Sequence, residues 1–179
     1  GYLKHSMADK PAGEVLYNMI SAVRLGGNFL FNVGPDRRGY VDPEREGKVL
    51  DRIGEWLSKH GEAVYGTQPT AIYDCRSNRQ GPSFHYGMFT GKGTTAYMTL
   101  FYYPEEYVVI SRIGPEITSA QLLSTGEELT VEPMSNKRFK ISGLPKDPPD
   151  SLAPVLRIEF ESEPYALEYS GAEWLEGKM

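Results

Sequence analysis

The chain has 179 residues, of which 40% are hydrophobic and 24% are charged, values that are ordinary for a globular protein. Its formal net charge is −5, and the acidic excess lies beyond residue 69. Because no segment is strongly basic, we expect no nucleic-acid partner. No apolar run has the length of a membrane-spanning helix, so we expect no membrane partner either.

The residues that most often carry metal or thiol chemistry are few. Cys75 is the single cysteine, which excludes an intrachain disulfide and a zinc site of the Cys-x-x-Cys type. We expect Cys75 to be a half-buried thiol on a strand rather than a nucleophile. His5, His60 and His85 show no metal-ligand spacing and are expected on the surface or in loops. The sequence therefore predicts no metal and no cofactor.

The first third of the chain predicts a helix, a strand and a second helix. Asp9 can cap a helix that Gly26-Gly27 ends, and its apolar face repeats at helical spacing. The face consists of Val15, Leu16, Met19, Ile20 and Val23. An apolar run over 28–33, bounded by glycine and by Gly34-Pro35, predicts a buried strand. One strand flanked by helices cannot close a sheet by itself.

Charged and glycine residues over 36–41 predict a turn, and Asp42-Pro43-Glu44 predicts the start of the second helix. Asp36 and Asp42 are interpreted as a turn residue and a helix cap rather than as catalytic acids. Gly61 fits the end of this helix. Its apolar face is expected to consist of Val49, Leu50, Ile53, Trp56 and Leu57.

From Thr67 onward, glycine and proline interrupt the sequence about every ten residues, and short alternating runs lie between them. Eight short strands at this spacing predict an antiparallel sandwich. We expect them near 71–73, 83–89, 95–101, 107–110, 120–123, 129–132, 138–141 and 155–160. The segment from Gly91 to Thr95 contains the residue types of a phosphate loop but not its glycine spacing, so it predicts a hairpin turn. The acidic tail, 162–179, is expected either to dock as one more strand or to lie loose.

Several motifs of the first 67 residues resemble one family. They are Gly1-Tyr2, Gly26-Gly27-Asn28, Asn32-Val33-Gly34-Pro35, Gly54-Glu55-Trp56-Leu57 and Gly61-Glu62-Ala63-Val64-Tyr65. This text resembles the C-terminal part of glycoside hydrolase family 29, the α-L-fucosidases. His60 stands where that family commonly has Asn. Beyond residue 67 the resemblance is confined to the order of strands and a Leu-Pro near the last of them.

The resemblance implies an α+β fragment. Residues 1–67 would be the helix-strand-helix remnant of a (β/α) barrel, and residues 68–179 an antiparallel β-sandwich. Family members are retaining glycosidases that remove terminal α-L-fucose from glycans with two carboxyl groups about 5 Å apart. No position here matches either catalytic motif, so no catalytic residue is assigned. The chain is expected to be inactive alone.

The resemblance also implies where substrate would lie. Barrel active sites form at the C-terminal ends of the strands, so Asn32 is a candidate substrate-binding residue, and a structural bond to neighbouring loops is its favoured alternative role. Tyr2 is a second candidate by its place beside the Trp of the family's Trp-Gly-Tyr, and packing is its alternative role. The partners implied are fucosylated glycans, bound through the parent catalytic domain. A secreted, periplasmic or lysosomal location would fit the family, and the exposed barrel remnant allows a homo-oligomer.

A carbohydrate-binding or interaction module is the alternative function. Tyr97, Tyr102, Tyr103 and Tyr107 could form a platform for sugar rings if they shared one face of the sheet. Residue parity puts Tyr97 with Phe101 and opposes Tyr102 to them. A structural brace for the barrel is the more economical role. An independent small enzyme finds no support, because no nucleophile elbow, phosphate loop or metal cluster occurs.

Overall fold

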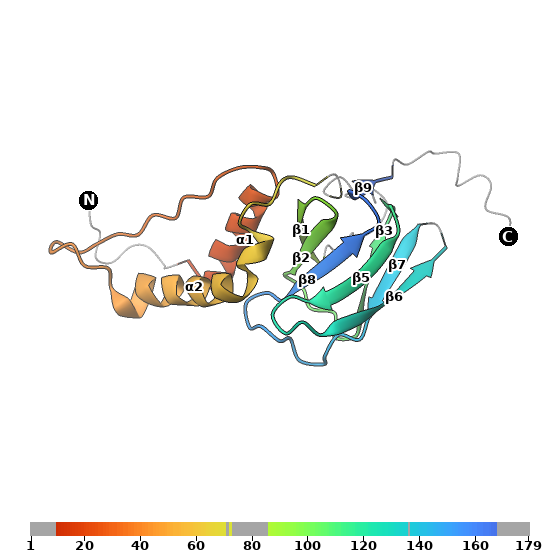
Figure 1. Ribbon diagram of the computed structural model, residues 1–179. Coiled ribbons are helices and arrows are strands. Elements are labelled where there is room, and N and C mark those ends of the chain that lie inside the picture. Colours follow the sequence, from red (N-terminus) through yellow and green to blue (C-terminus); the bar gives the residue numbers. More distant parts are fainter. Residues whose placement is uncertain (1–9, 71, 73–85, 136, 168–179) are drawn as a thin grey trace, which may run out of the picture.

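The computed structural model describes residues 10–70, 72, 86–135 and 137–167. It consists of a small helical part and a curled antiparallel sheet that lie side by side (Figure 1). The helical part holds two α-helices, α1 (Ala12–Val23) and α2 (Lys48–His60). No helix in the described part of the chain is both long and apolar enough to cross a membrane.

Helix α1 forms with its predicted apolar face, but Pro11 is its N-cap residue in place of the expected Asp9, which lies outside the described residues. Pro11 occupies the N-cap position, where the missing N–H of proline costs no helical hydrogen bond. Of the predicted apolar face, Val15, Leu16, Met19 and Ile20 are buried, and Val23 is half-buried. Gly26, with φ of +77°, ends the helix in the left-handed conformation that glycine adopts without strain.

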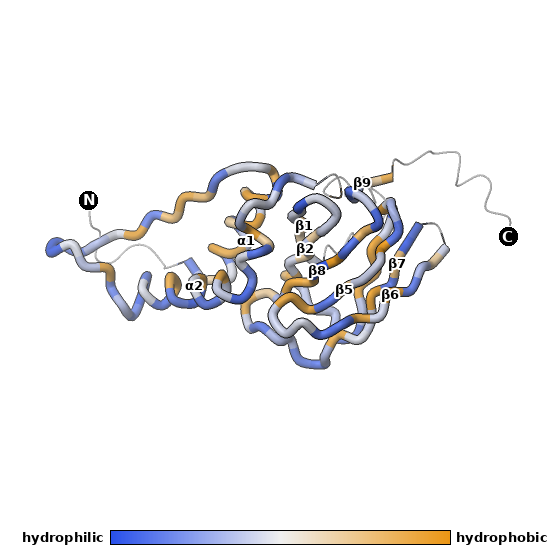
Figure 2. The backbone as a smooth tube through the Cα atoms, viewed as in Figure 1, coloured by the Kyte–Doolittle hydropathy of each residue, from blue (hydrophilic) through white to orange (hydrophobic). Residues whose placement is uncertain are grey.

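The strand predicted over 28–33 is wrong as a hydrogen-bonded strand. This segment runs from the end of α1 to the turn at 36–40, and its backbone makes no hydrogen bond to another described residue (Figure 1). Its side chains still alternate: Phe29 and Phe31 pack against the helices, whereas Leu30, 81% exposed, and Asn32 face outward. Figure 2 shows apolar stretches of this segment separated by polar residues, so it is the exposure of the side chains that alternates, and not their hydropathy. A strand needs a neighbouring strand to pair with, and none of the described residues supplies one.

Helix α2 follows a turn at residues 36–40 and a π-helical turn at Pro43–Gly47. Asp42 caps this start, because its carboxylate accepts the backbone N–H of Glu44 at 2.9 Å. Ile53, Trp56 and His60 are the buried residues of α2. Leu50, which we expected on the same face, is exposed.

The sheet holds seven strands in the order β1-β2-β8-β5-β6-β7-β3, and every pair is antiparallel. A separate two-stranded ribbon pairs β4 with β9. The strands are β1 (Gly87–Lys92), β2 (Thr95–Leu100), β3 (Tyr107–Ser111), β4 (Ile113–Gly114), β5 (Ile117–Leu122), β6 (Glu128–Met134), β7 (Arg138–Ser142), β8 (Val155–Phe160) and β9 (Tyr165–Ala166). The predicted antiparallel arrangement is therefore confirmed, and 91–95 forms the predicted hairpin turn.

Strand β6 turns the sheet back on itself. Glu128 and Leu129 pair with β5, whereas 130–134 pair with β7. The sheet therefore has two halves joined by one strand, as at a corner between the layers of a sandwich. The first core cluster lies inside the curl and draws on both halves, with Met98 and Leu156 from one and Phe139 from the other.

The helical part packs on the outer face of β1, β2 and β8. Both helices share a second core cluster with Met88, Tyr97 and Val155 of these strands. The indole N–H of Trp56 donates to the carbonyl oxygen of Ala153 at 2.7 Å, and the Thr90 hydroxyl donates to that of Ala63 at 2.6 Å. The buried residues of both helices thus share one core with the sheet, whereas Leu50 of α2 stays exposed.

Some expectations fall outside the described residues. Cys75, His5, Tyr2 and His85 lie there, as does most of the strand expected at 71–73 and the first part of the one at 83–89. The described end of the acidic tail contributes β9, whose pairing with β4 the sequence left open. The domain boundary between residues 67 and 68 stays a prediction.

Candidate functional site

The turn at residues 36–40 lies at the end of the helical part that is farthest from the sheet (Figure 1). The Asp36 carboxylate organises it by accepting the backbone N–H of Arg38 at 2.7 Å and that of Tyr40 at 3.1 Å. The same carboxylate accepts two hydrogen bonds from the Arg38 guanidinium, each of 3.2 Å. The Tyr40 N–H contributes most to lowering the pKa of Asp36, and the Arg38 donors lower it further. The interpretation of Asp36 as a turn residue is confirmed.

Of the two candidate substrate-binding residues, the structure describes one. Asn32 is exposed on the outward face of the 28–33 segment, two residues before Gly34. It makes no hydrogen bond to another described residue, so nothing in this part of the chain fixes its amide. Tyr2 lies outside the described residues, and the substrate-binding roles of both stay predictions.

The expectation of a surface or loop position for His60 is wrong. His60 is fully buried at the end of α2, where its ring lies 5.0 Å from that of Trp56. Its Nε2 atom is 3.5 Å from Oδ2 of Asp150, which is long for a hydrogen bond, and Lys59 approaches the same carboxylate at 3.7 Å. Burial lowers the pKa of His60 below its ordinary value, although Asp150 opposes that shift. The neutral, buried imidazole of His60 is therefore part of the interface between the helical part and the sheet, which we call the joint.

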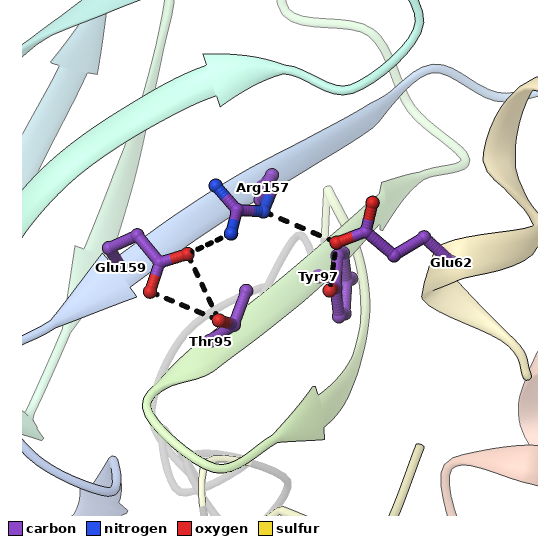
Figure 3. Close-up of polar contacts among 5 residues, drawn as sticks. All are labelled: Glu62, Thr95, Tyr97, Arg157 and Glu159. Atoms are coloured by element: carbon purple, nitrogen blue, oxygen red, sulfur yellow. Dashed lines mark hydrogen bonds and ion pairs between the residues drawn. The ribbon is translucent and has the colours of Figure 1, made fainter. Parts of the chain in front are cut away.

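A polar cluster closes one side of that joint (Figure 3). Glu62, just beyond α2, accepts a short hydrogen bond from the Tyr97 hydroxyl and pairs with Arg157 Nε at 3.3 Å. The guanidinium of Arg157 also pairs with Glu159 at 2.6 Å, and Glu159 accepts the Thr95 hydroxyl at 3.0 Å. The cluster thus connects the helical part to β2 and β8.

Two carboxylates share one guanidinium in this cluster, and each carboxylate also accepts a hydroxyl. Burial, followed by the hydrogen bond to the Glu62 carboxylate, raises the pKa of Tyr97 to about 12, so the hydroxyl stays protonated and donates. The Glu159 carboxylate beside Arg157 raises the pKa of that guanidinium, against the effect of burial. A protonated tyrosine and carboxylates that are paired with arginine do not offer a free base or nucleophile. We interpret the cluster as a structural clamp and not as an active site.

Sequence reasoning did not find this cluster. Thr95 and Tyr97 lie opposite Glu159 and Arg157 in the register of β2 and β8. The alternation that places each pair on one face is visible in the sequence. Which strand pairs with which is not, because β2 and β8 are separated by five other strands along the chain.

The four tyrosines of the predicted sugar platform do not share a face. Tyr97 is buried beneath the helices, and the Tyr103 hydroxyl donates to the carbonyl oxygen of Pro145. Tyr102 and Tyr107 are exposed, and Lys140 lies over the Tyr107 ring. The platform as predicted is therefore not formed.

Within the described ranges, no group of three or more His, Cys, Asp or Glu side chains is placed to hold a metal ion. The candidate functional features of the described residues are the outward face of 28–33 and the turn at 36–40, and the clamp around Glu62 is interpreted as structural.

A family model described as "Alpha-L-fucosidase" matches residues 1–62. Among curated proteins, the tissue alpha-L-fucosidase of Mus musculus is 32% identical over 152 residues, which cover 82% of this chain and 30% of that protein. The alpha-L-fucosidase of Dictyostelium discoideum is 32% identical over 136 residues, covering 74% of this chain and 28% of that protein.

Solved structures agree in fold. A Bacteroides thetaiotaomicron α-L-fucosidase of family GH29, trapped as a covalent intermediate with 2-fluoro-fucosyl fluoride, superposes with a TM-score of 0.72 at 28% identity. That match covers 89% of this chain and 35% of the other. Isoenzyme 1 from Paenibacillus thiaminolyticus gives a TM-score of 0.75 at 22% identity, over 90% of this chain and 37% of the other.

The chain spans about a third of the length of the relatives it matches. The match nevertheless extends over both the helical part and the sheet, since it covers most of this chain. The resemblance seen in the sequence motifs is confirmed by the family model, by the curated relatives and by the structures. The chain belongs to the α-L-fucosidase family, glycoside hydrolase family 29.

Proposed function

We propose that this chain is the C-terminal part of a retaining α-L-fucosidase that removes terminal α-L-fucose from glycans. In this proposal residues 10–66 supply the last strand and helices of a catalytic (β/α) barrel. The sheet braces them, and the catalytic carboxyl groups lie upstream. We use "parent polypeptide" for a chain that contains residues 1–179 together with that upstream region.

The observation that carries the proposal is the state of the 28–33 segment. One face, with Phe29 and Phe31, packs on the helices, and the other face, with Leu30 and Asn32, is open. A barrel strand has this arrangement, because one face meets the surrounding helices and the other points into the barrel. Its backbone makes no hydrogen bond with the described residues, which agrees with a barrel strand whose neighbouring strands lie upstream.

This geometry also supports a role for Asn32. On the open face Asn32 follows Leu30 toward the C-terminal end of the segment. Side chains that point inward at that end of a barrel strand reach the active-site mouth, whereas earlier ones fill the interior. Asn32 would therefore contact substrate or a neighbouring loop, and Leu30 would fill the barrel core.

The sheet serves as the brace in this proposal. It covers the outer faces of α1 and α2, and the clamp residues Glu62, Tyr97 and Arg157 tie the end of α2 to it. The turn at 36–40 lies at the opposite end of the helical part (Figure 1). The sheet is thus distant from the proposed mouth and suits support better than substrate binding.

Two measurements test the proposal. The first is hydrolysis of an aryl α-L-fucoside by residues 1–179 of confirmed mass and by the parent polypeptide. We expect turnover by the parent polypeptide only. Turnover by residues 1–179 alone would show that a carboxyl pair lies within this chain and would overturn the proposal.

The second measurement is hydrogen exchange at residues 28–33. The amides should exchange rapidly in residues 1–179, because they have no partner among the described residues, and slowly in the parent polypeptide. The control is β2, which should be protected in both. Rapid exchange of 28–33 in the parent polypeptide would contradict the barrel assignment even if the enzyme were active.

A further inference from the structure

The turn at residues 36–40 is a preorganised structure on an otherwise open segment. Besides the side-chain bonds of Asp36, its backbone N–H donates to the Tyr40 carbonyl oxygen at 2.8 Å, and Gly39 N–H donates back to Asp36 at 3.0 Å. Gly39 has φ of +86°, which glycine adopts without strain. The turn is therefore held by its own hydrogen bonds, although it contacts neither helix nor sheet through a core cluster.

The acidic groups nearest this turn are engaged, whereas Oε2 of Glu46, farther along the helix start, is buried without a hydrogen-bond partner among the described residues. Asp36 pairs with Arg38, Asp42 caps the helix start, and Glu44 pairs with Lys48 at 2.6 Å. Arg37 is exposed and has no hydrogen bond or ion pair among the described residues. The turn thus presents an unneutralised guanidinium, in a chain whose net charge is −5.

An exposed aromatic ring, that of Tyr40, belongs to the same turn as Arg37. Tyr40 is 68% exposed, and the Arg38 guanidinium lies 5.6 Å from the centre of its ring. A tyrosine offers a flat apolar face with a polar tip, and arginine offers a planar donor fork that matches a carboxylate or sulfate. A turn that carries both the exposed guanidinium of Arg37 and the exposed ring of Tyr40 suits a sugar with an anionic substituent.

The position of the turn decides what it would bind. This step rests on the proposed function: in a barrel, the loop after a strand lines the mouth of the active site. We propose that Arg37 and Tyr40 bind an anionic substituent, a carboxylate or a sulfate, on the part of the glycan next to the fucose. The enzyme would then prefer acidic fucosylated glycans to neutral ones.

The test compares three fucosylated oligosaccharides that share one linkage: a neutral one, its sulfated derivative and its sialylated derivative. The parent polypeptide should show a kcat/KM about three- to tenfold higher for at least one acidic substrate at low salt, mostly through KM. The two acidic substrates distinguish sulfate from carboxylate. Molar salt should remove the preference, because the site is exposed.

Arg37→Gln should bring the acidic-to-neutral ratio close to one. Arg52→Gln is the matched control, since Arg52 is also exposed but lies on α2 away from the turn. It should leave the ratio unchanged. A wild-type ratio of one, or a preference that survives Arg37→Gln, would overturn this inference alone. Hydrolysis of none of the three substrates would overturn the proposed function and this inference with it.

Discussion

The sheet and the helical part differ in how completely their backbone groups are hydrogen-bonded and their apolar side chains are buried. The first core cluster is enclosed by strands from both halves of the sheet, and each strand has a hydrogen-bonded neighbour. In the helical part, one face of 28–33 is open and its backbone is unpaired among the described residues. Every exposed leucine of the described residues, Leu25, Leu30 and Leu50, lies in the helical part.

In the proposed enzyme, this contrast would give the two parts different contacts with the upstream region. The sheet buries one face in its own core and the outer face of β1, β2 and β8 against the helices. The helical part packs on the sheet but leaves Leu30 and Asn32 exposed, on the face that the proposed barrel would cover. An apolar surface that is left open in this way marks a contact.

Of the proposed changes, Trp56→Ala should cause the largest loss in the free energy of unfolding, because it weakens the contact between the helical part and the sheet. Trp56 is 1% exposed, and its indole N–H bonds to Ala153 across the joint. Its loss should cost about 3–5 kcal/mol, since it removes a large buried side chain from the joint. Urea unfolding followed by hydrogen exchange should show that α1 and α2 lose protection while β8 keeps it.

Leu50→Ala, on the same helix but exposed, is the control and should change stability by less than about 0.5 kcal/mol. If Trp56→Ala leaves the unfolding curve unchanged, the joint does not depend on this residue, and the packing described for it would be contradicted.

Tyr97→Phe should weaken the joint to a smaller extent. It removes the hydroxyl that donates to Glu62 but keeps the ring that packs beneath the helices. We expect a loss of about 1 kcal/mol in the free energy of unfolding. Tyr107→Phe, an exposed position on β3, should have no effect, and equal losses in the two variants would refute the clamp.

The free energy of unfolding should depend on pH through the titration of His60. Its pKa is lowered in the folded chain from the ordinary value of 6.5, because burial disfavours the imidazolium more than Asp150 favours it. Below pH 6.5 the unfolded chain therefore binds the proton more readily than the folded chain. The free energy of unfolding should fall as the pH drops through this range.

His60→Gln should remove that part of the pH dependence, because glutamine does not titrate. The groups facing His60 are Asp150 and Lys59, and both stay in the variant. Chemical denaturation of both proteins between pH 5 and 8 checks this, and parallel curves would mean that His60 is not the titrating group.

The smallest effect is expected for Leu30→Ser in residues 1–179. Leu30 is open to solvent here, so stability should change by less than about 0.5 kcal/mol. In the parent polypeptide the same change would place a hydroxyl in the barrel core and cost about 2–5 kcal/mol. Equal effects in the two chains, measured by thermal unfolding, would argue against the barrel assignment.

Local signals predicted the helical part well. Periodic apolar residues gave the buried face of α1, Gly26 gave its end, and Asp42-Pro43 gave the start that leads into α2. The buried position of His60 could have been predicted too, because it follows Trp56 by four residues on the same helix face. Treating it as a loop residue ignored that spacing.

The pairing of strands that are distant in sequence could not be predicted. Runs of alternating residues predicted most strands of the sheet, but not that β2 lies between β1 and β8, nor that β4 pairs with β9. For the same reason the apolar run at 28–33 was expected to be a paired strand. An alternating pattern determines which side chains share a face, whereas pairing depends on which partners are present.

Strand β6 has a consequence for how the sheet comes apart. Its first residues, Glu128 and Leu129, belong to one half of the sheet, and the remainder belongs to the other. Neither half can unfold without breaking the hydrogen bonds of β6, which also belongs to the other half. The sheet should therefore unfold in one cooperative transition, and a protease should find no stable intermediate in which a single layer survives.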